Sequence, residues 1–163
     1  MWQTFMGRGL VVTALVASAA CGSTSKPAEP DPSTAATGVD VQRESLGSTD
    51  PSNAKGQTLH MTRVIFPPGY RIPTHTHPGT QLAFVERGTL TYAVVRGGEV
   101  AVHVPDGTTK RLRPGDKTQI PAGSWLIEEP GVVHYGSNET STKVVVLTSA
   151  LLGKGKPVST EAK

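Results

Sequence analysis

The chain has 163 residues, of which 18 are glycine, 13 are proline and only 18% are charged. This many glycine and proline residues exclude a helical bundle or coiled coil, and the length allows one domain of ordinary size with a short appendage. The small excess of 16 Lys and Arg over 13 Asp and Glu includes no long basic run, so we expect no binding to nucleic acid.

The first 20 residues are typical of a signal peptide. A single charge, Arg8, precedes an apolar stretch that is too short to span a bilayer, which takes about 20 apolar residues. Small residues follow, and then Cys21, the only cysteine in the chain. This order resembles a bacterial lipobox, in which the cysteine is lipidated, although Ser18 stands where lipoboxes usually carry Leu, Val or Ile. We therefore expect a lipid-anchored protein outside the cytoplasm, with ordinary cleavage and secretion as the alternative.

Residues 21–56 contain no aromatic side chain, and their prolines are scattered among small and polar residues. Such a segment buries too little apolar surface to offset its chain entropy, so we predict a flexible tether that begins at the lipidated cysteine. Val39, Val41 and Leu46 alternate loosely, and a first edge strand from about residue 39 is an open alternative. The folded domain therefore starts between residues 38 and 57.

From residue 57 onward the sequence alternates between apolar and polar residues in short runs that end at glycine and proline. This pattern predicts strands without helices, and hence a β-sandwich or barrel over residues 57–152 with room for one small ligand. A polar tail, residues 153–163, follows. Gly97-Gly98 is typical of a two-residue hairpin turn. The predicted strands cover residues 58–66, 80–87, 89–96, 99–104, 117–121, 124–128, 132–137 and 143–151, with 89–96 paired to 99–104 across the two glycines.

Two histidines, His75 and His77, lie two residues apart in a segment expected to be extended. Alternation along a strand places both imidazoles on one face, where two neutral rings form half of a site for a divalent transition metal. A pair of this kind is also common in surface loops, so the pair alone does not establish a site.

The spacing around these histidines resembles the first motif of the cupin family. The pattern is Gly69, five residues, His75, one residue, His77, three residues, Gln81, six residues, Gly88. The family usually has Glu at the position of Gln81.

A second stretch resembles the second cupin motif. It runs Gly123, five residues, Glu129-Pro130-Gly131, two residues, His134, three residues, Asn138, with the proline displaced by one place from its usual position. The resemblance covers residues 57–152. It implies a small antiparallel β-barrel or double-sheet jelly roll, often dimeric, that holds a divalent metal such as Fe, Mn, Ni or Zn. The implied ligands are His75, His77, Gln81 and His134.

The position of Gln81 matters because an amide supplies no negative charge to a metal. Alternation places Gln81 on the same face of its strand as Ala83 and Val85, and Glu86 on the opposite face, where it cannot replace a missing carboxylate. A site of three His and one Gln therefore carries more net positive charge than one with Glu. The alternatives are that Gln81 only packs, which leaves three histidine ligands, or that the site holds no metal.

Two functions remain open at this stage. The first is a metal-dependent cupin that binds a small organic molecule and, if it is an enzyme, acts as a dioxygenase-like oxidoreductase. The second is a non-catalytic lipoprotein that binds a ligand or metal. No catalytic residue is predicted: Glu86, Glu128 and Glu129 are candidates only by residue type. Three aromatic residues could line a pocket, although core packing is the commoner role. They are Tyr92, Trp125 and Tyr135.

Overall fold

The computed structural model of the protein describes residues 40–162. The predicted signal peptide and the lipidation site predicted at Cys21 lie outside the described residues. Within the described range the secondary structure consists of strands, and no helix there is long and apolar enough to cross a membrane.

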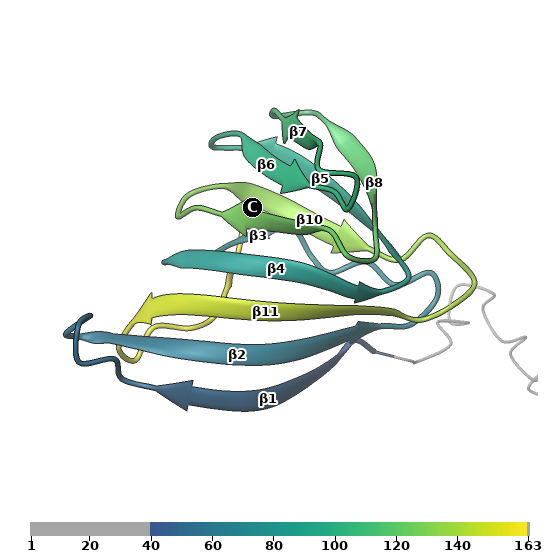
Figure 1. Cartoon of the computed structure of the whole chain (residues 1–163). Helices are drawn as coiled ribbons and strands as arrows, with labels where there is room; N and C mark the ends of the chain where they lie inside the picture. The colour runs from purple at the N-terminus through teal and green to yellow at the C-terminus, as the bar shows by residue number, and fades with distance from the viewer. Residues whose placement is uncertain (1–39, 163) are drawn as a thin grey trace, which may run out of the picture. The chain divides into compact units, whose positions relative to one another are not determined.

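The strands form two antiparallel sheets, which confirms the predicted all-β jelly roll (Figure 1). The larger sheet contains, in spatial order, β1 (Gln42–Thr49), β2 (Gln57–Phe66), β11 (Val144–Gly153), β4 (Thr80–Arg87), β9 (Trp125–Glu128), β6 (Val100–His103) and β7 (Thr109–Leu112). The smaller sheet contains β12 (Thr160–Glu161), β3 (His75–Thr76), β10 (Val133–Ser137), β5 (Thr89–Arg96) and β8 (Lys117–Pro121).

The core lies between the inner faces of the two sheets. Strand β4 alternates as the sequence predicts: Ala83 and Val85 are buried, whereas Leu82 and Phe84 face outward. Burial of each branched aliphatic side chain in such a core contributes about 1.5–3 kcal/mol. The aliphatic side chains that are completely buried include Val85, Val100, Val102, Ile120, Leu126, Val144 and Leu152.

The predicted hairpin across Gly97-Gly98 is wrong. Strand β5 pairs with β10 and β8, whereas β6 pairs with β7 and β9, so the glycine pair carries the chain from one sheet to the other. Gly97 has a φ of +89°, and a Cβ there would lie 2.1 Å from the carbonyl oxygen of Gly131. Adjacent glycines allow a positive φ and close backbone approach in a hairpin and in a crossing alike, so the sequence signal fits both.

Strands also form at both ends of the described chain. At the start, β1 pairs with β2 along the edge of the larger sheet. The pairing runs from Gln42 opposite Ile65 to Thr49 opposite Leu59. At the end, residues 154–162 return to the smaller sheet, and we call them the C-terminal strap. Within the strap, β12 pairs with β3, which brings the C-terminus beside β3 (Figure 1). The polar C-terminal residues are therefore part of the wall next to the histidine pair.

Candidate metal centre

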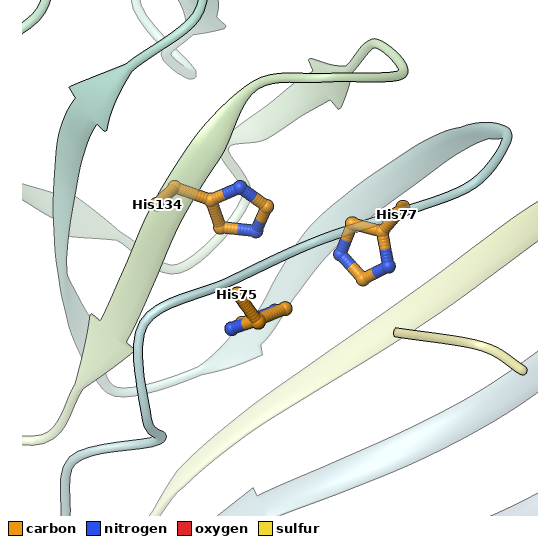
Figure 2. A group of neighbouring side chains, drawn as sticks. All are labelled: His75, His77 and His134. Atoms are coloured by element: carbon orange, nitrogen blue, oxygen red, sulfur yellow. The ribbon is translucent and has the colours of Figure 1, made fainter. Parts of the chain in front are cut away.

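Three histidines, from β10 and from β3 with the residue that follows it, meet on the face of the smaller sheet that lines the cavity between the sheets (Figure 2). His75 lies in β3, His77 follows directly after it, and His134 lies in β10 opposite His75. One ring nitrogen from each histidine lies within 4.8 Å of the others, so these three residues could hold a metal ion. The sequence placed all three in the candidate site, and the structure brings them together.

Each of these imidazoles is fixed by a backbone carbonyl oxygen. Because a carbonyl oxygen only accepts hydrogen bonds, the ring nitrogen that faces it carries the proton and donates. In the neutral ring the Nε2 atom then keeps its lone pair and can bind a metal. The three Nδ1 donors and their acceptors are His75 to Pro73 (2.8 Å), His77 to Val158 (2.7 Å) and His134 to Val132 (3.2 Å).

The site also contains a carboxylate, Glu128. The sequence analysis named this residue as a catalytic candidate only because it is a glutamate. It ends β9, and its residue is 4% exposed. Its Oε1 atom lies 3.1 Å from Nε2 of His134, and its Oε2 atom lies 3.3 Å from Nε2 of His77. A buried carboxylate therefore lies against two of the three imidazoles.

The other two glutamates named from the sequence lie outside the site. Glu86 is exposed, as its place in the alternation predicts, and its carboxylate lies 3.5 Å from the Arg63 guanidinium. Glu129 is also exposed and accepts a hydrogen bond of 2.8 Å from the Thr80 hydroxyl. Only Glu128 among the three contributes charge to the interior.

Gln81 faces the site, as the sequence predicts, and it is 6% exposed. It lies directly across the β4–β9 strand pair from Glu128. Its amide Nε2 donates to Oε2 of Glu128 at 2.6 Å and lies 3.1 Å from Nε2 of His77. The side chain thus directs its amide nitrogen, which is not a metal donor, toward the carboxylate.

Burial and mutual contact shift the pKa values of these groups. Burial, followed by the charge of His134, lowers the pKa of His75 to about 4, so this ring is neutral at pH 7. Burial also disfavours charge on His77, but the hydrogen bond and charge of Glu128 outweigh it and raise the pKa of His77. Burial of Glu128 is likewise outweighed, by its contacts with His134 and His77, which hold the pKa of its carboxyl well below the usual value. The site therefore holds an ionised carboxylate.

The three histidines, Gln81 and Glu128 line a cavity of about 90 Å³ between the sheets. This volume holds several waters or a small organic molecule. The walls are mainly apolar, and Val158 and Ser159 of the C-terminal strap contribute to the lining. The apolar lining residues are Val64, Phe66, Ile72, Ala83, Leu90, Leu126, Val146 and Val158.

Tyr92 contributes a polar group to the cavity wall. The residue is 2% exposed, and its ring stacks on His134 with centroids 5.3 Å apart. Its hydroxyl makes no hydrogen bond of good geometry with the described residues. Burial, followed by the charge of Glu128, raises the pKa of Tyr92 well above its usual value, so the hydroxyl keeps its proton. A hydrogen bond to Glu128 contributes to the same shift, so the hydroxyl lies beside this carboxylate on the cavity wall, where it could also donate to a ligand.

The remaining residues singled out from the sequence have structural roles. Trp125 stacks on His103 with centroids 3.8 Å apart, and Tyr135 lies under the Arg71 guanidinium, 3.7 Å from its ring centroid. Asn138 of the second motif is fully buried and donates from Nδ2 to the carbonyl oxygens of Phe66 (3.1 Å) and Thr142 (2.7 Å). These contacts hold the loop between β10 and β11.

The donor set fits a divalent transition metal. Imidazole nitrogens and a carboxylate are the usual ligands of Zn²⁺ and of non-haem iron and related ions. The Nε2 lone pairs of His77 and His134 lie close to the Glu128 oxygens. Both kinds of atom only accept hydrogen bonds, so protons or a cation must lie between them. A metal would replace these protons on binding.

Residues 62–150, more than half of the chain, match the Cupin domain family. The chain belongs to the cupin family. No curated protein is significantly similar to this cupin.

Several solved structures are similar to this cupin at low identity. A conserved Klebsiella pneumoniae protein with a double-stranded β-helix domain is 20% identical, with 78% of this chain and 88% of that chain covered and a TM-score of 0.40. Salicylate 1,2-dioxygenase from Pseudaminobacter salicylatoxidans is 13% identical over 56% of this chain and 20% of its own, with a TM-score of 0.42. Oxalate decarboxylase from Lactobacillus farciminis is 14% identical over 63% and 26%, with a TM-score of 0.44. This cupin thus spans about a quarter or less of the two enzyme chains.

Proposed function

We propose that this cupin is an exported protein that binds a divalent transition metal, Fe, Mn, Ni or Zn, and a small organic ligand in its cavity. The observation that carries the proposal is the convergence of three buried or half-buried histidines, each fixed through Nδ1, on one end of an apolar cavity. Histidines held in this way present their Nε2 atoms to a common point.

Different residues of the site would bind the metal and the organic ligand. His75, His77 and His134 would hold the metal, which when bound supplies a Lewis acid and open coordination positions. The Tyr92 hydroxyl would donate a hydrogen bond to an oxygen atom of the ligand. The apolar walls would exclude water and favour a ligand with an apolar body.

We infer a dioxygenase-like oxidoreductase as the activity if this cupin is an enzyme. One observation favours the alternative, a non-catalytic binding protein. Among the described residues that line the cavity, Glu128 is the only carboxylate, and it is held by His77, Gln81 and His134. A general base free to accept a proton from the ligand is therefore not found in the lining.

We also propose that Cys21 is lipidated and anchors the protein outside the cytoplasm, with secretion as the alternative. The support is the order of apolar core, small residues and single cysteine in the first 21 residues. A Cys21→Ser variant should move from the membrane fraction to the soluble fraction. Membrane retention of this variant would exclude lipidation as the anchor. Pairing of two copies stays a prediction, which light scattering of the purified protein tests.

The metal site is tested by elemental analysis of the purified full chain. We expect about one transition-metal ion per chain in the natural sequence and loss of that metal in a His75→Ala/His77→Ala variant. The matched control is His60→Ala/His103→Ala, which removes two histidines outside the site and should leave the metal content unchanged. Equal metal content in the two double variants, or none in the natural sequence, would refute the site.

Oxygen consumption then separates enzyme from binding protein. The metal-loaded chain is mixed with a panel of phenols and small carboxylic acids, and dissolved oxygen is recorded. Consumption that depends on one compound and is lost in His75→Ala/His77→Ala supports the dioxygenase. Binding of a compound without oxygen consumption supports the non-catalytic alternative.

A further inference from the structure

We propose that Glu128 is the carboxylate ligand of the metal and that Gln81 positions it. This inference rests on the proposed metal site and assigns a ligand that the cupin motif does not contain. The motif resemblance pointed to Gln81, in β4. The structure instead offers a carboxylate from β9, directly opposite in the strand pair. The carboxylate that the cupin motif places in β4 is thus supplied from the facing position in β9.

The first argument is the position of the carboxylate. Its two oxygens lie 3.1 Å and 3.3 Å from the Nε2 atoms of His134 and His77, the ring nitrogens that the Nδ1 hydrogen bonds leave for a metal. An ion bound to these two nitrogens would lie within reach of the same carboxylate. Glu128 requires no rearrangement of its strand to join the histidines.

The second argument is the orientation of the Gln81 amide. A carboxylate oxygen accepts only, so the Gln81 atom 2.6 Å from Oε2 of Glu128 must be the amide nitrogen, which donates. The same nitrogen faces Nε2 of His77. With its nitrogen held in this way, Gln81 does not present its carbonyl oxygen to the histidines. It fixes the orientation of Glu128 in the way that outer hydrogen-bond partners orient metal ligands.

The third argument is charge. A divalent ion bound by three neutral imidazoles brings two positive charges into a mainly apolar cavity, and burial of uncompensated charge is costly. The Glu128 carboxylate is the only acidic group among the described residues that line the cavity. It halves the net charge of the centre, as the motif glutamate of the family would from β4.

The experiment exchanges the two residues. The dissociation constant for Zn²⁺ is measured by competition with a chromophoric chelator for the purified full chain and three variants. Glu128→Gln should weaken Zn²⁺ binding by at least about 100-fold, because loss of a direct ligand should cost no less than loss of a partner that orients one, which costs up to about 100-fold. The double variant Gln81→Glu/Glu128→Gln returns the carboxylate to β4 and should recover most of this loss. Glu129→Gln, the matched control on the neighbouring exposed residue, should bind as the natural sequence does.

A second readout distinguishes a ligand from a neighbouring charge. The visible absorption spectrum of the Co²⁺-loaded protein reports the atoms bound to the metal, and Glu128→Gln should change its bands. The exchanged variant restores a carboxylate ligand and so should restore bands typical of one. Far-UV circular dichroism establishes that each variant folds. If Glu128→Gln does not fold, the exchanged variant decides: tight Zn²⁺ binding supports the proposal, and weak binding contradicts it.

The outcomes separate this inference from the proposed function. If neither the natural sequence nor any variant binds Zn²⁺, the metal site itself fails. If the natural sequence binds Zn²⁺, His75→Ala/His77→Ala does not, and Glu128→Gln binds as tightly with an unchanged Co²⁺ spectrum, the metal site stands and Glu128 is not its ligand.

Discussion

The two sheets of this cupin supply different chemistry to the same cavity. The smaller sheet brings the imidazoles of His75, His77 and His134, together with the Tyr92 hydroxyl. The larger sheet brings one carboxylate, Glu128, and the amide that holds it. The candidate nitrogen ligands thus come from one sheet and the negative charge from the other. A metal that uses both would tie the two sheets together.

The largest effect should follow from removal of a nitrogen ligand. His134→Ala should weaken Zn²⁺ binding by more than about 100-fold, because a direct ligand contributes more than the partners that orient it. Competition with a chelator measures the change. His103→Ala, on the outer face where it stacks on Trp125, is the control and should bind normally. Equal affinities for the two variants would show that the smaller sheet does not supply the metal ligands.

The crossing between the sheets gives a second test, on stability. Gly97→Ala should lower the free energy of unfolding by about 2–3 kcal/mol, because a Cβ at this positive φ would lie 2.1 Å from the Gly131 oxygen. Gly107→Ala is the matched control: its φ is +84° but no atom lies within 4 Å of the added Cβ. Denaturant unfolding should show a smaller loss for the control. Equal losses of stability would mean that the positive φ alone, and not the close approach to Gly131, accounts for the effect of alanine at position 97.

The C-terminal strap should affect the metal through His77. Removal of residues 157–163 deletes the Val158 carbonyl that accepts the Nδ1 hydrogen bond at 2.7 Å, and with it the strand that pairs with β3. We expect Zn²⁺ binding to weaken by about 10-fold, the lower part of the range for loss of a group that orients a ligand. Glu161→Ala keeps the backbone pairing and should bind normally. Unchanged Zn²⁺ affinity in the truncated protein would show that the C-terminal strap does not contribute to the metal site.

The smallest effect is expected at Tyr92. Tyr92→Phe removes only the hydroxyl and should leave Zn²⁺ affinity within about twofold, since the ring that stacks on His134 remains. Acetate serves as a probe with ligand-like oxygens, and its binding to the Co²⁺-loaded protein is followed by visible absorption. Loss of one hydrogen bond predicts about 2-fold to 10-fold weaker acetate binding. Stronger or equal acetate binding would show that the hydroxyl does not contact the ligand.

The resemblance to the two cupin motifs predicted the three histidines, and alternation along the strand predicted the face on which Gln81 lies, because motif spacing and alternation are local properties. Glu128 was not predicted, for a specific reason. In the run from Trp125 to Glu128 both faces of the strand carry apolar residues, so alternation does not tell which face is buried. The pairing of Glu128 with Gln81 joins residues far apart in the chain, and no local pattern encodes that register.

The C-terminal strap was unpredictable for a similar reason. Val158 is an isolated apolar residue in a polar segment, and its contribution to the site is a backbone carbonyl, which every residue has. The Gly97-Gly98 hairpin failed because local turn chemistry does not specify which strands a turn separates. Local signals therefore identified the donors of the smaller sheet, whereas the contribution of the larger sheet depends on long-range pairing.

The most direct test is a crystal structure of the metal-loaded protein with anomalous diffraction at the metal absorption edge. We predict one ion bound by the Nε2 atoms of His75, His77 and His134 and by an oxygen of Glu128, at about 2.0–2.2 Å for Zn²⁺. Gln81 should remain hydrogen-bonded to the carboxylate. An ion bound by the three histidines and the Gln81 oxygen, with Glu128 displaced, would contradict the account.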